Sequence, residues 1–367
     1  LREINLPDMK HITALAILLI LIVTAGFAQT PGNIEAAEYD PTENRWFISN
    51  GTSLLETSNG GVSYSYFGTA TATHGMEVVD GMLIAIGNNI VRAYDLESGD
   101  ALGALSISGA SFLNGMGSRS GEVIVSDFST GRIHRVLIAD PSNMSSEVLV
   151  SNTGTTPNGV VIDEANNRAI IVNWGNNASI LATDLDSGEL TTLVNGSGIG
   201  NLDGIDMDAD GNFYVSSWSP ARITKYSNDF STSEVAVQGA GSGLANPADI
   251  SYATQTDTLG VANSGNGTPS FHYFGDTSEL IETPSFLESV QWDGRQLTLA
   301  CQQAGLWYGT AFDLAGKKLN EFQISLPGAP TQVGIDRIGW GQTTPCIWTF
   351  ISPSGTQHSI KPGLRQL

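Results

Sequence analysis

The sequence predicts an all-β protein, a six-bladed β-propeller followed by a small C-terminal β-sandwich. The chain is rich in glycine, with 42 Gly among 367 residues, and only 14% of its residues are charged, as expected for many tight turns. A polar residue followed by Gly recurs at a nearly constant spacing, and each repeat contains four short apolar segments. Four short strands in a repeat of about 40–45 residues are typical of a propeller blade.

The repeats begin at positions 35, 74, 114, 158, 203 and 248, in steps of 39, 40, 44, 45 and 45. In the fourth repeat the pattern predicts strands at 169–172, 179–184 and 190–194, and in the fifth at 213–216 and 222–226. A many-stranded sandwich is the competing all-β architecture, but it does not explain a fixed period. We therefore place the propeller at residues 31–284.

The charge balance excludes some partners. Lys and Arg number 16 against 37 Asp and Glu, a formal charge of −21. Nucleic acid and anionic membrane surfaces are bound mainly through clustered Lys and Arg, so we expect neither as a partner. Most acidic residues, such as Asp208 and Asp210, are expected to be solvated turn residues.

The N-terminal segment is predicted to direct export. Residues 9–28 combine a short basic start, an apolar run at 12–23 and a small-residue end, the pattern of a signal peptide. Residues 1–8 are interpreted as a non-native upstream segment. A membrane helix is the alternative, but the run is shorter than the ~20 residues that span a bilayer. We expect a secreted or cell-surface protein without a permanent membrane span.

The residues that open the repeats are candidate site residues, because the first strand of every propeller blade lines the central channel. They are Glu35, His74, Asn114, Asn158 and Asp203, and Ala248 breaks the series. Carboxylate and amide oxygens suit a hard cation, above all Ca²⁺. The alternative is that the Asn-Gly and Asp-Gly pairs are ordinary turns.

Three of these positions carry a family resemblance. Glu35 in Glu-Ala-Ala-Glu-Tyr-Asp, Asn158 in Pro-Asn-Gly and Asp203 in Leu-Asp-Gly resemble the metal-ligand motifs of the SMP-30/gluconolactonase/LRE-like propellers. The resemblance implies one divalent cation, usually Ca²⁺ although Zn²⁺ is also used, held by these three residues. It also implies that Asn114 contacts substrate or a metal-bound water. Sugar-lactone hydrolases of the family carry Arg two residues before that Asn, where this chain has Phe112.

The resemblance suggests a metal-dependent hydrolase of a small-molecule lactone or ester. Asp203 and His74 are the candidate bases; the resemblance favours Asp203, and the ordinary pKa of histidine, about 6.5, favours His74. The alternative function is a non-catalytic propeller that binds a ligand or partner and uses its cation only structurally.

Aromatic residues follow the second strand of several repeats, where the chain returns to the face of the opening residues. Phe128, Trp174 and Trp218 occupy such positions. With Phe112, Trp174 and Trp218 are candidates for substrate contact, and together they favour an apolar substrate. The alternative is that the two Trp side chains only pack between blades.

Residues 285–367 are predicted to form the C-terminal sandwich, with strands at 296–301, 306–312, 319–324 and 347–351. The segment 312–318, Phe-Asp-Leu-Ala-Gly-Lys-Lys, resembles the motif of type IX secretion sorting domains, which implies the secretion machinery as a partner. A generic accessory sandwich is the alternative. Cys301 and Cys346 could form a disulfide in an oxidising compartment, but the sequence does not decide this.

Overall fold

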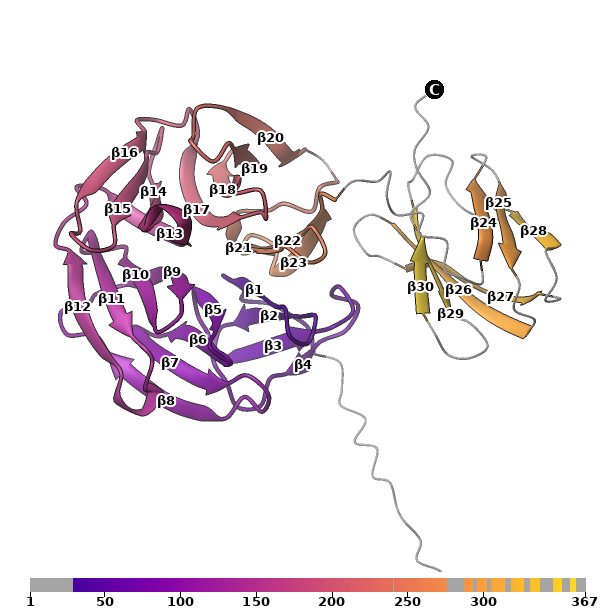
Figure 1. Cartoon of the computed structure of the whole chain (residues 1–367), viewed down its shortest axis with the longest axis horizontal. Coiled ribbons are helices and arrows are strands. Elements are labelled where there is room, and N and C mark those ends of the chain that lie inside the picture. Colours follow the sequence, from indigo (N-terminus) through magenta and orange to yellow (C-terminus); the bar gives the residue numbers. More distant parts are fainter. Residues whose placement is uncertain are drawn as a thin grey trace, which may run out of the picture.

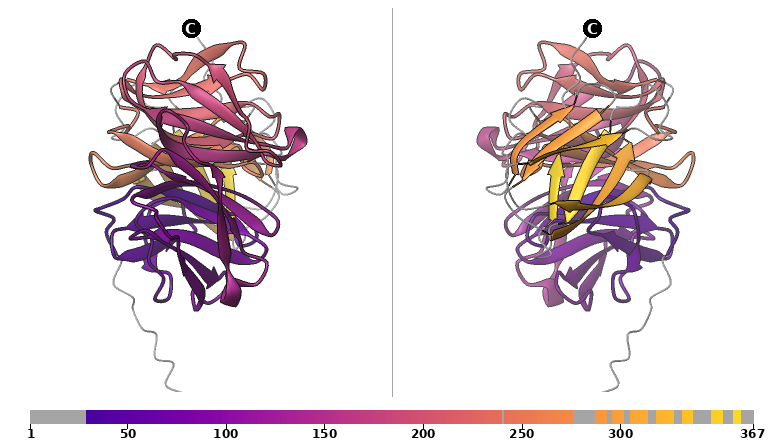
Figure 2. Two further views of the ribbon diagram at one scale, coloured as in Figure 1. Left: turned by 90° about the vertical axis from the view of Figure 1, so that its left-hand side faces the viewer. Right: turned by 90° about the vertical axis from the view of Figure 1, so that its right-hand side faces the viewer.

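A computed structural model describes residues 29–239 and 241–275 with their side chains, together with the backbone of strands β24–β30 between residues 287 and 360. Residues up to 275 form a six-bladed β-propeller, as predicted. The blades are arranged in a ring around a central axis in Figure 1, and Figure 2 shows the ring from two sides. The proposed signal peptide lies outside the described residues.

Each blade is an antiparallel sheet whose strands follow one another from the channel outward. Blade 1 contains β1 (Ala37–Asp40), β2 (Arg45–Asn50), β3 (Ser53–Thr57) and β4 (Ser65–Tyr66). Blade 2 contains β5 (Met76–Val79), β6 (Met82–Gly87), β7 (Ile90–Asp95) and β8 (Ala101–Ser106). Blade 3 contains β9 (Leu113–Arg119), β10 (Glu122–Asp127), β11 (Arg132–Leu137) and β12 (Ser145–Val150).

The second half of the ring repeats this order. Blade 4 contains β13 (Thr156–Asp163), β14 (Arg168–Trp174), β15 (Ile180–Asp184) and β16 (Leu190–Val194). Blade 5 contains β17 (Gly200–Met207), β18 (Phe213–Ser219), β19 (Ala221–Tyr226) and β20 (Ser233–Gln238). Blade 6 contains β21 (Pro247–Ala253), β22 (Thr258–Asn263) and β23 (Thr268–Tyr273). The strands predicted in blades 4 and 5 are confirmed, with ends that differ by up to three residues.

The hydrophobic core is divided among the six blade interfaces. One cluster of buried apolar side chains joins each neighbouring pair, including Met82 with Leu113 between blades 2 and 3 and Tyr214 with Leu259 between blades 5 and 6. Because both faces of a middle strand are covered, β6 and β10 are buried throughout their length. Burial of this apolar surface is the main force that holds the blades together.

The glycine of each repeat motif has a steric role rather than a turn role. A Cβ atom on Gly115 would lie 2.2 Å from the carbonyl oxygen of Asn158, and one on Gly159 would lie 2.3 Å from that of Asp203. Both glycines are within inner strands, β9 and β13. The interpretation of these pairs as ordinary turns is therefore wrong, since the glycine lets neighbouring inner strands approach closely.

Blades 1 and 6 meet where the ring closes. Among the described residues, no strand from the start of the chain pairs with the sheet of blade 6. The Asp249 N–H donates to the Glu35 carbonyl oxygen at 3.0 Å, and the rings of Trp46 and Phe271 lie 5.1 Å apart. Blade 6 has three described strands; its predicted fourth strand would fall among residues outside the described ranges.

The C-terminal strands form two further antiparallel sheets. Their bounds are β24 (Leu287–Trp292), β25 (Gln296–Cys301), β26 (Gly305–Asp313), β27 (Lys318–Leu326), β28 (Thr331–Asp336), β29 (Cys346–Ile351) and β30 (Gln357–Ile360). The four predicted strands correspond to β25, β26, β27 and β29. The side chains of Cys301 and Cys346 lie outside the described part, so the disulfide stays a prediction.

Candidate functional site

Glu35, Asn158 and Asp203 come together near the start of the inner strands of blades 1, 4 and 5, at the end of the channel that we call the mouth. Asp203 is 7% exposed, and burial raises the pKa of its carboxyl well above the ordinary value. The negative charge of Glu35 raises this pKa further, whereas the side chains of Trp218 and Asn158 lower it. Burial also raises the pKa of Glu35 to about 7. The two carboxyls are thus close enough to repel each other and are withdrawn from water.

The amide of Asn158 is only partly satisfied by the protein. The side chain is 1% exposed, and its Nδ2 donates to the Leu202 carbonyl oxygen at 3.2 Å. Its Oδ1 has no hydrogen-bond partner among the described residues. A buried polar atom without a partner costs free energy, so this oxygen is suited to a ligand that supplies the missing interaction.

The donor set fits a hard cation. Two carboxyl groups and one unpartnered amide oxygen provide oxygen ligands without sulfur or nitrogen, which is the preference of Ca²⁺. The described residues contain no group of three or more His, Cys, Asp or Glu positioned to hold a metal ion. Any cation here would therefore depend on the amide oxygen and on water or substrate for its remaining ligands.

His74 lies beside Phe112 in this mouth. The two rings are 4.9 Å apart and nearly perpendicular, and His74 Nδ1 lies 2.9 Å from Thr73 Oγ1. Burial lowers the pKa of His74 to about 4. The ordinary pKa near 6.5 expected for this histidine is therefore wrong, and the ring is neutral and weakly basic at pH 7.

Asn114 is an inner-strand residue of β9, next to the glycine that spaces the strands. Its carbonyl oxygen accepts a hydrogen bond from the Gly75 N–H at 3.0 Å. Its side chain is half-buried. The structure thus places Asn114 in the ring of opening residues without a described partner that would define its role.

The aromatic residues gather as the strand direction predicts. Phe112 and Phe128 have ring centroids 5.5 Å apart, Phe128 and Trp174 6.0 Å, and Trp174 and Trp218 4.9 Å. The last of these, Trp218, lies beside Asp203. A line of rings therefore leads from His74 to the carboxyl pair.

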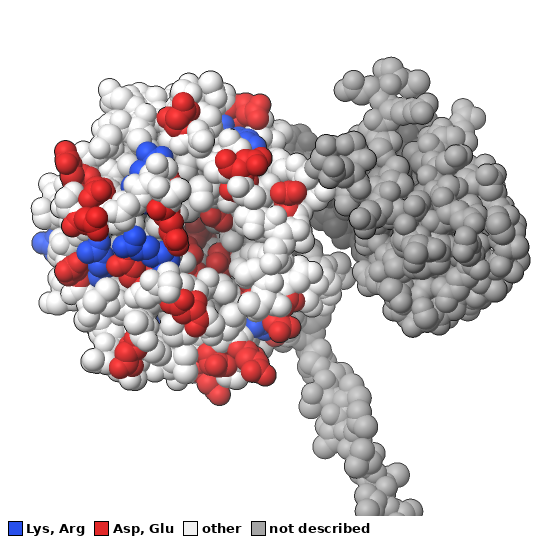
Figure 3. Space-filling model, viewed as in Figure 1, with Lys and Arg blue, Asp and Glu red and all other residues white. Residues whose placement is uncertain are grey.

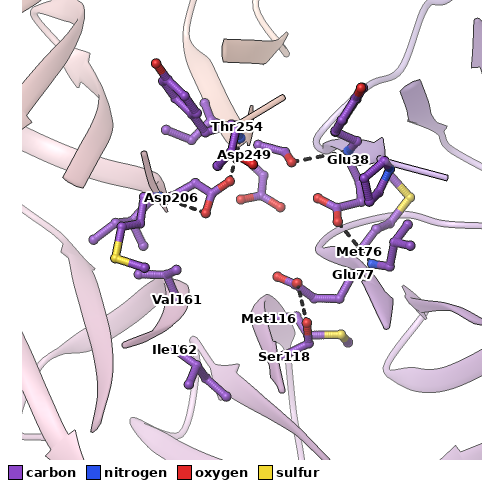
Figure 4. Close-up of a pocket in the computed structure, with 18 residues that line it drawn as sticks. Glu38, Met76, Glu77, Met116, Ser118, Val161, Ile162, Asp206, Asp249 and Thr254 are labelled. Atoms are coloured by element: carbon purple, nitrogen blue, oxygen red, sulfur yellow. Dashed lines mark hydrogen bonds between the residues drawn. The ribbon is translucent and has the colours of Figure 1, made fainter. Parts of the chain in front are cut away.

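A second set of carboxyls, which we call the deeper set, lies farther along the inner strands from the mouth and was not predicted. Glu38, Glu77, Asp206 and Asp249 point toward one another in a pocket of about 250 Å³ (Figure 4). The described residues that line this pocket include no Lys, Arg or His. Figure 3 shows acidic residues on the wall of the central hollow.

Close packing of these acids shifts their titration. Burial, then the charge of Asp206, raises the pKa of Glu38 to about 8, and burial raises that of Asp206 to about 6. The pKa values of Glu77 and Asp249 are raised well above the ordinary value, first by burial and then by neighbouring acids. Protons on several of these groups relieve their mutual repulsion at neutral pH.

Irregular strands explain why both acidic sets face the channel. The pairing of β17 with β18 shifts between Leu202 and Ile205, so a bulge separates Asp203 from Asp206. Residues three apart, rather than two, then share the inward face. The same three-residue spacing relates Glu35 to Glu38, and this recurrent spacing is the signal by which the deeper acids could have been found.

Comparisons with solved structures support the fold. A gluconolactonase from Xanthomonas campestris matches with a TM-score of 0.51 at 15% identity, over 66% of this chain and 86% of that protein. Regucalcin from Agrobacterium tumefaciens, a calcium-binding protein, matches with a TM-score of 0.50 at 16% identity, over 66% and 90%. The structural neighbours thus include six-bladed propellers of the SMP-30/gluconolactonase type.

The same fold also occurs in other settings. A chain of the nidogen/laminin complex matches with a TM-score of 0.50 at 14% identity, over 76% of this chain and 92% of that one. No protein-family model and no curated protein matches the sequence. At these identities, likeness to solved structures establishes the architecture alone. Among the described residues, no helix has the length and apolar character needed to cross a membrane.

Proposed function

We propose that the chain is a hydrolase that opens a lactone or ester bond with the help of one divalent cation. The observation that carries this proposal is the convergence of Glu35 and Asp203 with the unpartnered, buried Oδ1 of Asn158. These three oxygen donors would hold the cation, with Ca²⁺ preferred over Zn²⁺ because no sulfur or nitrogen ligand accompanies them in the part of the chain that the structure describes.

The chemistry that a divalent cation supplies in such a site is polarisation of a carbonyl oxygen and acidification of water. The protein would contribute a proton acceptor and a partly dehydrated surrounding. Asp203 is the preferred acceptor, because its carboxyl lies in the ring of opening residues beside Glu35, Asn158 and Trp218. His74 is a weaker base, since its pKa is lowered to about 4; we assign it and Asn114 to substrate orientation.

The test combines metal analysis with a substrate panel. Purified protein is assayed on lactones and aryl esters with EDTA, and again after addition of CaCl₂ or ZnCl₂. We expect EDTA or Asp203→Asn to lower turnover by more than about 100-fold. Asp210→Asn is the matched control, because Asp210 is an exposed turn residue near the same blade. Activity that survives Asp203→Asn would contradict the role of Asp203.

A non-catalytic propeller is the second candidate. It is favoured by the small ligand set, with two carboxyls and one amide, and by the weak basicity of His74. The nidogen/laminin neighbour illustrates a propeller found in a protein complex. Stoichiometric Ca²⁺ without EDTA-sensitive turnover on any substrate would favour a structural cation and a binding function.

We also infer that the protein is exported and that its C-terminal region is recognised by a secretion system. This rests on the sequence of residues 9–28 and on the motif at 312–318. Expression of the full chain in a host with type IX secretion, with and without residues 285–367, tests it. Retention of the truncated chain in the cell is the expected result, and equal secretion would contradict it.

A further inference from the structure

An unbroken line of aromatic rings, which we call the aromatic wall, leads to the candidate site. It runs from His74 through Phe112, Phe128 and Trp174 to Trp218, with neighbouring centroids 4.9 to 6.0 Å apart. The interplanar angles of 61° to 86° are those of edge-to-face contacts, which stabilise aromatic pairs beyond their buried area. The line crosses blades 2 to 5 and ends beside Asp203.

The wall is held in place by the backbone around it. The buried carboxylate of Asp127 accepts hydrogen bonds from the N–H groups of Ser111 and Phe112, both at 2.9 Å. The Phe128 N–H donates to the Phe112 carbonyl oxygen at 2.8 Å. The backbone that carries the rings of Phe112 and Phe128 is therefore held in place before any ligand arrives, which reduces the entropy cost of binding.

These rings touch one another across neighbouring blades but lie outside the buried cores of the blade interfaces. Phe112, Phe128, Trp174 and Trp218 belong to none of the clusters of buried apolar side chains at the blade interfaces. All four are half-buried, so part of each residue stays exposed to solvent. Four such rings beside two carboxyl groups combine an apolar wall with a few convergent polar groups, as ligand sites do.

We propose that this aromatic wall binds an alkyl or aryl substituent next to the reacting carbonyl, so that the site selects apolar lactones or esters over polyhydroxylated sugar lactones. The inference rests on the proposed hydrolase function and names its substrate class. A groove lined by Asn and Thr side chains, including Asn173 and Thr155, adjoins Trp174, which makes a sugar lactone the necessary competitor.

The kinetic test compares γ-nonalactone, γ-butyrolactone and glucono-δ-lactone. The first two share a ring and differ by a pentyl chain, and each methylene that the wall buries should raise kcat/KM about fourfold. We expect γ-nonalactone to exceed both others by at least about 30-fold. Phe128→Ala and Trp174→Ala should each lower this preference about tenfold. Tyr66→Ala, which removes an exposed ring on the outer strand β4, should leave it unchanged.

A binding measurement separates this inference from the hydrolase proposal. The probes are 5-pentylpyrrolidin-2-one, a lactam that resists hydrolysis, and unsubstituted pyrrolidin-2-one, titrated calorimetrically in CaCl₂. Tighter binding of the pentyl lactam, weakened by Phe128→Ala, supports the wall even if no lactone is hydrolysed. Equal binding or no binding of the two lactams, a preference unchanged in Phe128→Ala, or faster turnover of the sugar lactone would overturn it.

Discussion

The two acidic sets of the channel carry the same kind of charge but differ in how the protein satisfies it. At the mouth, the Glu35 carboxyl accepts no hydrogen bond from the described residues. The Nε1 of Trp218 lies beside Asp203 but likewise has no hydrogen-bond partner among these residues. In the deeper set, Glu38 accepts from the Val78 N–H at 3.0 Å and Glu77 accepts from Ser118 Oγ at 2.8 Å. Both sets are desolvated, but only the mouth also contains an unpartnered amide oxygen.

The mouth therefore has oxygen atoms that are free to bind a ligand, whereas the carboxyls of the deeper set are already bonded to protein donors. Asp206 accepts from the N–H groups of both Tyr252 and Met207, so its oxygens are already occupied. A buried carboxyl with protein donors gains less from an added cation than one without them. We therefore place the cation at the mouth and expect protons in the deeper set.

The largest expected effect is on Ca²⁺ affinity, and it distinguishes two glutamates that are three residues apart in the sequence. Glu35→Gln should weaken Ca²⁺ binding by more than about 100-fold, because it removes one of only two carboxylate ligands. Glu38→Gln should change the affinity by less than about threefold, since its carboxyl is held by protein donors. Isothermal titration with CaCl₂ measures both. Equal losses in the two variants would show that the cation lies deeper in the channel than we infer.

The next largest effect is a loss of stability when the inner strands are forced apart. Both acidic sets depend on the close spacing of these strands. Gly115→Ala would press a methyl group against the backbone of Asn158 and Gly159, at 2.2 and 2.6 Å. Backbone atoms cannot move aside as a flexible side chain can, so we expect a loss of about 2 kcal/mol or more in the free energy of unfolding. Gly32→Ala, with nothing within 4 Å, is the control. Urea denaturation that shows equal stability for both variants would contradict the close approach of the strands.

The deeper set should give the metal-free protein an unusual pH dependence. The pKa of Glu38 is raised from 4.5 to about 8 and that of Asp206 from 3.8 to about 6. The folded state then binds more protons than the unfolded state, so this stability is present below about pH 4 and is lost as the pH rises toward 8. The unfolding midpoint in EDTA should therefore be higher at pH 5 than at pH 8, by at least about 2–4 °C.

A neutral replacement sharpens that test. Glu38→Gln should exceed the native protein in stability at pH 8 and match it at pH 5, because glutamine resembles the protonated glutamate. Glu43→Gln, on an exposed turn, should follow the native protein at both values. Thermal unfolding followed by circular dichroism suffices, and a Glu38→Gln variant that is less stable at pH 8 would refute the assignment.

The sequence predicts the ring and its mouth well because both depend on a repeated pattern. The positions of Glu35, Asn158 and Asp203 are among the six that the repeat period gives, and the resemblance selects these three; β16 begins and ends at the predicted residues, 190 and 194. The periodicity also predicts that the second strands return to the same face, which the contacts of Phe128 with Trp174 confirm.

Other features depend on contacts that no periodicity encodes. Regular alternation places residues two apart on one face, so the inward position of Asp206 requires the bulge in β17. Burial lowers the pKa of His74, and the residues next to it in the sequence do not predict that burial. Asp208, expected to be solvated, is 7% exposed and pairs with Lys225 at 3.1 Å, because the turn folds back on β19.

The smallest expected effect comes from one hydrogen bond in the deeper set. Ser118 Oγ donates to Glu77 and lowers the pKa of its carboxyl against the larger effect of burial. Ser118→Ala should therefore cost about 0.5–1 kcal/mol, with a larger cost at pH 8 than at pH 5, because the donor stabilises the ionised form of Glu77 more than the protonated form. Ser120→Ala, an exposed neighbour, controls for the loss of a hydroxyl. If both pH values gave the same cost, Ser118 would act through packing, whereas a change in Ca²⁺ affinity would mean that the two acidic sets are energetically coupled.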